Sequence, residues 1–399
     1  MNNYNFETVP SRYAVNAPKW LEIKKYHPEE PAGIIPFSVA DMEFEVAPEI
    51  REGLKKYIDT YIVGYANPTP AFQQAVVDWM KRHHNWDVKP EWMVYTNGVI
   101  NAFYEAVKAF TKPGDGVLLM TPVYYPMYSA ITVNGRKVVE NKLINTGTRY
   151  EIDFEDLEKK AADPNVPMLI FCNPHNPGGR VWTREELEKV ADICLRNNVL
   201  MVSDEIHFDL VRKDVKHTVL ASLSKEVADH TLTFTAASKT FNLAGYTTST
   251  AIISNPELKD RFYKELSNCM MHIRCNVLGH EATRLAYTEG DEWFAQCWDI
   301  IVDNYYTVKN FLAKEFPTVK VHDMEGTYLL WMDFRSLGIE PKLMAEALKK
   351  EGYLFFDDGF VFGEAGAGFE RWNLACPKKY VEEGLVRLKN VLNKYRTDK

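Results

Sequence analysis

Short apolar runs rich in β-branched residues recur between residues 93 and 253, and helix-period segments separate several of them. The runs span residues 93–96, 117–120, 168–172, 200–203, 231–235 and 249–253. Parallel strands need long crossover connections, which are usually helices, so this alternation predicts an α/β fold built on a mainly parallel sheet. Thr183 with Glu186 three residues later forms a capping box, which predicts a helix over 183–197.

The chain is long enough for two domains. At 399 residues it exceeds the roughly 300 residues at which single cores stop growing. Beyond about residue 290 the pattern changes to a long helical stretch over 293–316, followed by strand, helix and strand pieces. We therefore expect a large domain over 48–290 and a smaller α+β domain formed by 1–47 and 291–399. The first forty residues are rich in proline and are expected to wrap over another part of the molecule.

Charge and composition exclude several classes of function. The net charge is −8, and basic residues occur as scattered pairs, so the chain lacks the electrostatic footprint of a nucleic-acid or anionic-membrane binder. No apolar run of membrane-spanning length and no signal-like start occur, which predicts a soluble cytoplasmic protein.

Cysteine and histidine spacing does not predict a metal site. The six cysteines show no Cys-x-x-Cys pair, and we interpret them as reduced packing residues. They are Cys172, Cys194, Cys269, Cys275, Cys297 and Cys376. We interpret the pair His83-His84 as a polar surface pair at a helix end.

Polar residues follow the carboxyl ends of the predicted strands, where open parallel sheets bind ligands. Gly98 and Val99 follow the first run and open a helix, which suits a phosphate, although an ordinary turn has the same form. Tyr124 follows the second run and could stack on a flat ring or pack within the loop. Asp204 follows the fourth run, and an acid placed there needs a cationic or donor partner.

Lys239 follows the fifth run and has polar neighbours in Ser238-Lys239-Thr240. A lysine forms Schiff bases when its amine is held neutral, and pyridoxal phosphate is the cofactor most often attached in this way. One lysine is weak evidence by itself, because most lysines are solvated surface charges.

Together these motifs resemble the fold-type I pyridoxal-phosphate enzymes, in the class I and II aminotransferase branch, over nearly the whole chain. The turn Asn173-Pro-x-Asn-Pro-x-Gly179 matches the family turn whose second asparagine, Asn176, donates to the phenolic oxygen of the cofactor. Asp204 matches the partner of the pyridine nitrogen, and Lys239 matches the Schiff-base lysine. Arg371 matches the arginine that binds the α-carboxylate of the substrate, a role that suits its planar guanidinium.

The resemblance also implies the rest of the cofactor site. It implies a seven-stranded sheet, Tyr124 stacked on the cofactor ring, and the backbone of Gly98 and Val99 on the phosphate. It further implies a homodimer in which Tyr65 reaches the phosphate of the partner subunit, although Tyr65 could equally be interface packing.

Departures from the aminotransferase pattern indicate a subclass. His207 stands where many aminotransferases have tyrosine, Thr247 where they have a phosphate-binding arginine, and Ala236 where a serine is common. The phosphate must then rely more on backbone amides and on hydroxyls such as Ser238.

Three short motifs resemble the carbon–sulfur β-lyase subfamily typified by the MalY and PatB cystathionine β-lyases. They are Asp204-Glu-Ile-His207, the Ser-Lys-Thr-Phe-Asn-Leu-Ala-Gly run from Ser238, and Val39-Ala-Asp-Met42. Asp41, Met42 and residues 360–362 are candidates for contacts with the substrate.

The resemblance implies an enzyme that cleaves cystathionine or related cysteine S-conjugates to a thiol, pyruvate and ammonia. An aminotransferase acting on an amino acid and a 2-oxo acid is the alternative, because the same carbanion can be reprotonated instead of eliminating. A non-enzymatic regulatory role is the third possibility, and the intact Lys239, Asp204 and Arg371 argue against it.

Overall fold

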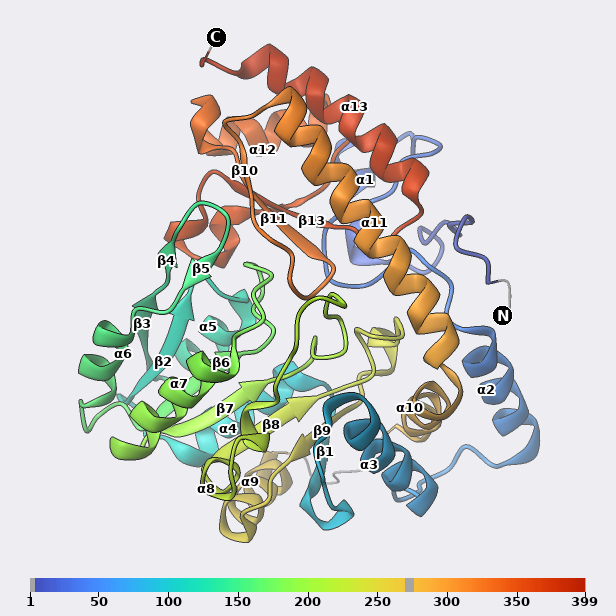
Figure 1. The fold of residues 1–399 in the computed structure, drawn as a ribbon. Coiled ribbons are helices and arrows are strands. Elements are labelled where there is room, and N and C mark those ends of the chain that lie inside the picture. The colour runs from blue at the N-terminus through green and yellow to red at the C-terminus, as the bar shows by residue number, and fades with distance from the viewer. Residues whose placement is uncertain (1–3, 270–275, 399) are drawn as a thin grey trace.

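The computed structural model describes residues 4–269 and 276–398. Its largest sheet has seven strands (Figure 1). In spatial order they are β1 (Met93–Thr96), β9 (Ser249–Ile252), β8 (Thr231–Thr235), β7 (Leu200–Asp204), β6 (Met168–Cys172), β2 (Gly116–Thr121) and β3 (Lys137–Lys142). Within this sheet only β9 runs antiparallel to its neighbours. The predicted α/β class and mainly parallel sheet are therefore confirmed.

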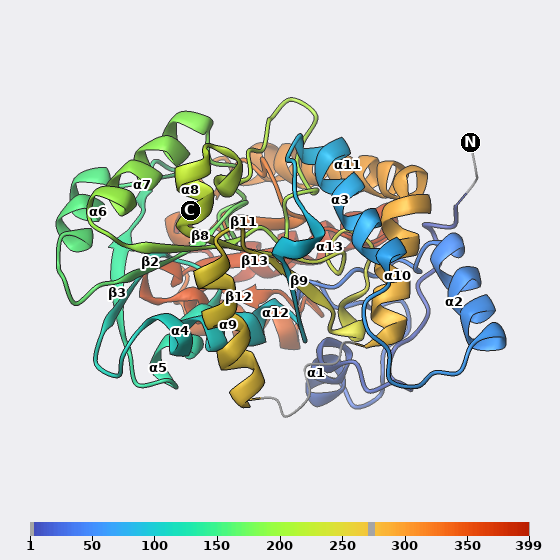
Figure 2. The same ribbon diagram turned by 90° about the horizontal axis from the view of Figure 1, so that it is seen from below.

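Helices cover both faces of this sheet (Figure 2). One face carries α4 (Val99–Phe110), α5 (Tyr125–Thr132) and α9 (Pro256–Cys269), and the other carries α6 (Phe154–Ala161), α7 (Arg184–Arg196) and α8 (Lys225–Asp229). Alternate residues of β2 pack into the hydrophobic cores on the two faces of the sheet. Val117 and Leu119 pack on the first face, and Leu118 and Met120 pack on the second. Burial on both faces explains why these strands read as continuous apolar runs.

The edge strand β3 was not among the predicted runs. It pairs only with β2 in this sheet, and of its six residues only Asn141 is buried. A strand with one free edge and a solvated side does not need a continuous apolar sequence.

A second, antiparallel sheet lies above the first in Figure 1. Its strands are, in order, β10 (Lys320–Val321), β11 (Leu329–Asp333), β13 (Phe369–Asn373) and β12 (Asp357–Asp358). It is accompanied by α11 (Asp291–Glu315), α12 (Pro341–Lys350) and α13 (Lys378–Tyr395). The predicted smaller α+β part is confirmed, while the exact domain limits at 47/48 and 290/291 stay a prediction.

The N-terminal segment connects the two sheets. After α1 (Pro18–Tyr26), Phe37 N donates to Phe355 O and Asn373 N donates to Phe37 O, at 2.9 and 2.8 Å, beside β13. A few residues on, Met42 N donates to Asn242 Oδ1 at 2.9 Å, close to Lys239. The chain then continues through α2 (Pro48–Thr60) and α3 (Pro70–His84), which pack on α10 (Val277–Glu289). A small hairpin, β4 (Ile144–Asn145) with β5 (Tyr150–Glu151), completes the described strands.

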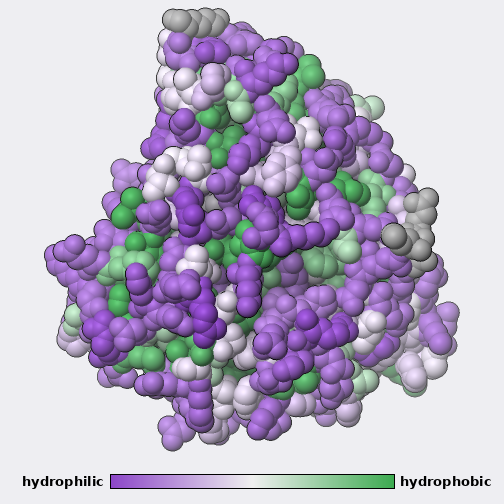
Figure 3. Space-filling view, in the orientation of Figure 1, coloured by the Kyte–Doolittle hydropathy of each residue, from purple (hydrophilic) through white to green (hydrophobic). Residues whose placement is uncertain are grey.

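The surface is mainly polar on the face shown in Figure 3, with hydrophobic residues in small separate groups. Within residues 4–269 and 276–398, no helix combines the length and the apolar character needed to cross a membrane. Of the cysteines, Cys172, Cys194, Cys297 and Cys376 are buried and free, whereas Cys269 is free and exposed, so its assignment as a packing residue is wrong. Cys275 lies outside the described residues.

The capping box at the start of α7 is present as predicted. Thr183 Oγ1 accepts from Glu186 N at 3.2 Å, and Glu186 Oε2 accepts from Thr183 N at 2.7 Å. We expect Thr183→Ala to lower the free energy of local opening of the first turn of α7 by about 1 kcal/mol. Amide hydrogen exchange over α7 measures this.

Thr307→Ala in the interior of α11 is the matched control. Thr307 Oγ1 only donates back to Asp303 O within its own helix, at 2.9 Å. Loss of the Thr307 hydroxyl should leave local opening of α11 unchanged or slightly less favourable, because alanine is the better helix former. Equal destabilisation by the two variants would show that the capping box contributes nothing beyond the loss of a hydroxyl.

Candidate active site

The carboxyl ends of β1, β2, β6, β7 and β8 meet at one edge of the large sheet, because these strands are parallel, and a cavity of about 340 Å³ lies there. Its size falls within the range of small-ligand sites. Eight of the residues predicted from the sequence line it: Gly98, Val99, Tyr124, Asn176, Asp204, His207, Ser238 and Lys239. The fold thus brings together side chains from five separate strand ends.

Lys239 lies just after β8 and points to the N-terminal segment. Its Nζ donates to Ala40 O at 2.6 Å. Burial lowers the pKa of Lys239 to about 8, and Asp41 partly opposes this effect. A lysine in this state has a substantial neutral fraction near pH 8, which is the form that attacks a carbonyl.

Asp204 ends the neighbouring strand β7 and is 3% exposed. Its Oδ1 accepts from Ile206 N at 3.2 Å. Burial raises the pKa of Asp204 to about 7, and the hydrogen bond from Ile206 only partly offsets it. A carboxylate in this position is costly unless a cation pairs with it, and a protonated pyridine nitrogen is such a cation.

The start of α4 fits a phosphate. Gly98 precedes the helix with φ of 89°, a conformation that favours glycine, and Asn97, Gly98 and Val99 all line the cavity. The first N–H groups of a helix have no partner inside it, so they can donate to an anion. The hydroxyl residues Ser238, Thr247 and Thr248 also line this cavity, and so does Ala236.

Tyr124 and His207 are both neutral in this setting. Tyr124 is half-buried, and burial raises the pKa of its phenol. His207 is 3% exposed, and burial lowers the pKa of its imidazole well below the usual value, with the charges of Lys239 and Arg371 acting in the same direction. In the described part of the chain, His207 Nδ1 is buried without a hydrogen-bond partner. It can therefore form a hydrogen bond with a ligand in the cavity.

Arg371 enters from the second sheet, on β13, and contacts a cavity residue. Its Nη1 donates to Asn176 Oδ1 at 2.8 Å, and its Nη2 donates to Asp357 Oδ2 at 2.6 Å. Because the carbonyl oxygen of Asn176 faces Arg371, the amide NH₂ group of Asn176 remains as a donor for a ligand in the cavity. The guanidinium is almost fully buried, with 2% of the side chain exposed.

Two predicted residues lie apart from this group. The carboxylate of Asp41 is bound by Lys19 Nζ at 2.7 Å and Arg12 Nη2 at 2.6 Å, and these cations lower the pKa of Asp41 against the opposing effect of burial. Its charge is therefore already paired within the N-terminal segment. Tyr65 is 88% exposed and lines a second, shallow cavity that shares Asn97, Asn101 and Thr247 with the first.

Several contributors were not predicted from the sequence. They include the backbone oxygen of Ala40 and the carboxylates of Asp357 and Asp209. Asp209 Oδ2 accepts from Thr240, next to Lys239, at 2.6 Å, and its Oδ1 accepts from Trp79 and His84 at 3.0 and 2.7 Å. The side chain of His84 is 4% exposed, so its assignment to the surface is wrong. The Asp204-Glu-Ile-His motif continues to Asp209, but no local pattern identifies the partners on α3.

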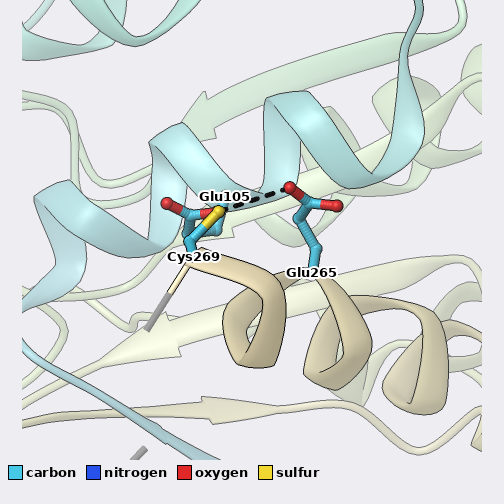
Figure 4. Close-up of side chains that lie close together, drawn as sticks. All are labelled: Glu105, Glu265 and Cys269. Carbon is cyan, nitrogen blue, oxygen red and sulfur yellow. Dashed lines mark hydrogen bonds between the residues drawn. The ribbon is translucent and has the colours of Figure 1, made fainter. Parts of the chain in front are cut away.

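One group of possible metal ligands occurs away from this site in the described residues, formed by Glu105, Glu265 and Cys269 on α4 and α9 (Figure 4). Lys108 Nζ lies 3.2 Å from Glu105 Oε2, 3.1 Å from Glu265 Oε1 and 2.5 Å from Cys269 Sγ. An ammonium group thus already supplies the positive charge among these ligands.

Comparison with known proteins agrees with this geometry. The family model for aminotransferase class I and II matches residues 32–388. Cystathionine beta-lyase PatB of Bacillus subtilis is 38% identical over 389 residues, which cover 98% of this chain and all of PatB. Protein MalY of Escherichia coli is 30% identical over 394 residues, covering 98% of this chain and all of MalY.

Among solved structures, cystalysin from Treponema denticola, which contains a pyridoxal 5'-phosphate cofactor, superposes with a TM-score of 0.96. It is 44% identical, and the match covers 98% of this chain and all of cystalysin. The family model and these relatives span almost the full length, and the chain belongs to the class I and II aminotransferase family.

Proposed function

We propose that this chain is a pyridoxal-phosphate-dependent carbon–sulfur β-lyase that cleaves cystathionine or related cysteine S-conjugates to a thiol, pyruvate and ammonia. The observation that carries the proposal is the convergence of Lys239, Asp204 and Asn176 in one cavity, with Arg371 bound to Asn176. The choice of reaction is supported by the names of the relatives, cystathionine beta-lyase PatB and cystalysin among them.

The residues at the cavity fit this cofactor. The N–H groups at the start of α4 and the hydroxyls of Ser238, Thr247 and Thr248 would hold its phosphate. Asp204 would pair with the ring nitrogen, Asn176 would donate to the phenolic oxygen, and Tyr124 would lie against the ring. Lys239 would attach it covalently.

When bound, pyridoxal phosphate supplies an electron sink for negative charge at the α-carbon of the substrate. Lys239, once displaced by the substrate amine, removes the α-proton. Its pKa of about 8 suits this work, because a general base is most effective near the working pH. Asp204, at the end of β7, would hold the ring nitrogen of the cofactor in its protonated form, in which the ring accepts electrons best.

Arg371 and Asn176 orient the substrate for this step. Arg371 binds the α-carboxylate, and its hydrogen bond to Asn176 links carboxylate recognition to the residue that contacts the cofactor. With the α-hydrogen aligned, loss of the proton is followed by departure of the sulfur on the β-carbon as a thiolate, a good leaving group. The remaining enamine hydrolyses to pyruvate and ammonia.

An aminotransferase is the second candidate, and the description of the matching family model favours it. The same side chains would remove the α-proton, but the proton would return to the cofactor instead of the β-substituent leaving. This reaction consumes a 2-oxo acid and releases no thiol. The two candidates are therefore separable in one assay.

We further propose that the protein acts as a homodimer in the cytoplasm. Exposed apolar side chains follow α2, with Tyr61, Ile62, Val63 and Tyr65 exposed by 60, 94, 51 and 88%. A contiguous exposed apolar segment of this kind is typical of an interface. It adjoins the cavity wall at Asn97, Asn101 and Thr247, where a partner subunit could reach the phosphate. The free thiols of the five described cysteines suit a reducing compartment.

The central test is product release from cystathionine without any 2-oxo acid. We expect wild-type protein with its cofactor to release thiol and pyruvate in equal amounts. Lys239→Ala should lower the rate by about a thousandfold or more, because it removes both the attachment point and the base. Lys137→Ala, an exposed lysine on the edge strand, is the control and should match wild type. Pyruvate that appears only when an oxo acid is added, or no thiol at all, would contradict the lyase assignment.

The buried carboxyl of Asp204 predicts a pH-dependent stability of the cofactor-free protein. Its pKa of about 7 in the folded state lies above the unfolded value of about 3.9, so the folded state binds the proton more tightly. This stabilisation is fully present below pH 4 and is lost as the pH rises to about 7. We expect Asp204→Asn to abolish this pH dependence, which amounts to about 4 kcal/mol of unfolding free energy between pH 4 and pH 8.

Urea unfolding of the cofactor-free proteins across pH 4 to 8 measures this difference. Taking the difference between wild type and variant cancels the other titrating groups. The excess pH dependence of wild type should shrink when the cofactor is added. Parallel stability curves for the two proteins would show that Asp204 is not held in a dry environment.

The role of Tyr65 across the interface predicts complementation. We expect Tyr65→Ala and Lys239→Ala each to be impaired alone, and mixed dimers to regain activity. In a mixed dimer one site has an intact Lys239 and receives an intact Tyr65 from the other subunit. Random exchange of subunits should restore about a quarter of the wild-type rate. No recovery, in a mixture shown by mass spectrometry to contain mixed dimers, would place Tyr65 outside the site of its partner.

A further inference from the structure

Asp357 lies directly opposite Arg371 in the second sheet, in the antiparallel pair of β12 and β13. Its Oδ2 accepts from Arg371 Nη2 at 2.6 Å, and 15% of the side chain is exposed. A carboxylate of the protein thus contacts the guanidinium to which we assign the carboxylate of the substrate.

Two of the five N–H donors of the Arg371 guanidinium contact protein side chains. Its Nη1 is bound to Asn176, its Nη2 to Asp357, and its face lies over the ring of Phe362, with the guanidinium carbon 4.6 Å from the ring centre. Within the described residues, its Nε is buried without a partner. An arginine takes a carboxylate in a two-bond contact through Nη2 together with Nη1 or Nε. Nη2 belongs to both arrangements, and Asp357 holds one of its two N–H groups, so an incoming carboxylate lies next to the carboxylate of Asp357 in either arrangement.

A second donor converges on the same oxygen. Val39 N donates to Asp357 Oδ2 at 2.9 Å. Val39 has φ of 57°, which is unfavourable for a β-branched residue, and such conformations persist only where the surroundings impose them. The carbonyl of Val39 is held by Asn373 Nδ2 at 2.7 Å. The two donors, from β13 and from the N-terminal segment, thus form a cradle for one carboxylate oxygen.

We propose that Asp357 is an internal competitor for this cradle, which the α-carboxylate of the substrate must displace. The inference rests on the proposed function, in which Arg371 binds that carboxylate. At rest Asp357 neutralises the buried guanidinium, so simple anions gain little by binding there. A substrate with an amine and a sulfur side chain gains further contacts, and these offset the loss of the internal pair.

The same competition acts at the end of the reaction. Pyruvate keeps a carboxylate but has lost the amine and the sulfur substituent. Asp357 then returns to Arg371 and Val39 N and speeds the release of the product. Asp357 is thus a specificity residue, which favours ligands that bind through more than a carboxylate.

The test measures binding of an unreactive probe to the protein with its cofactor in place. The probe is 3-(methylthio)propionate, which has the carboxylate and the sulfur but no amine. We expect Asp357→Asn to bind it about tenfold more tightly than wild type, because a charged competitor for a charge-assisted hydrogen bond is lost. Isothermal titration calorimetry gives the dissociation constants, and the corresponding amide, 3-(methylthio)propionamide, should bind equally to both proteins.

Glu364→Gln is the matched control. Glu364 is an exposed acid in the loop before β13. Its substitution by glutamine removes one negative charge at a position outside the cradle. It should bind the probe as wild type does. Asp357→Ser, which cannot reproduce the shape of the carboxylate, is a second variant and should also tighten binding if Asp357 competes.

Weaker binding in both Asp357 variants would overturn the inference and show that Asp357 orients Arg371 for its ligand. Unchanged binding, or equal tightening in Glu364→Gln, would overturn it as well. These outcomes are separable from failure of the proposed function. Absence of thiol release from cystathionine would reject the reaction, whereas the affinity for the probe does not depend on which reaction follows.

Discussion

A carboxyl group buried at the end of a central strand is the constraint on which the site depends. Asp204 is 3% exposed and lies on β7 beside the strand that leads to Lys239. Burial raises its pKa to about 7 and lowers that of Lys239 to about 8, so the two groups are poised close to neutral pH. Burying ionisable side chains in this way lowers the free energy of unfolding. Such a loss of stability is typical of sites that bind and activate a ligand.

The N-terminal segment joins this cavity to the second sheet. Its residues 39–42 contact Lys239 through Ala40 O, Asp357 through Val39 N and Asn242 through Met42 N. Lys19, with 1% of its side chain exposed, pairs with Asp41 and Glu43 and fixes the segment from the opposite side. Both sheets therefore meet at one short loop, which explains why a proline-rich segment without regular periodicity is ordered there.

Much of the fold and most of the site followed from local sequence, and the exceptions share one physical cause. Strands buried on both faces gave continuous apolar runs, and the residues after them reached one edge because parallel strands share their direction. Contacts between distant segments leave no such signal. Asp41 was a candidate for the substrate, but Lys19 and Arg12 bind its carboxylate. No local pattern marks Asp357, because it meets Arg371 only through the pairing of β12 with β13.

Among all the lysines of the chain, Lys239 is the one to which we assign the cofactor. Reduction of the protein with borohydride in the presence of pyridoxal phosphate fixes the cofactor on its lysine, and mass spectrometry of the peptides then locates it. We expect the added mass on the peptide that contains Ser238-Lys239-Thr240, at one cofactor per chain. Attachment at another lysine, with Lys239 unmodified, would contradict this assignment.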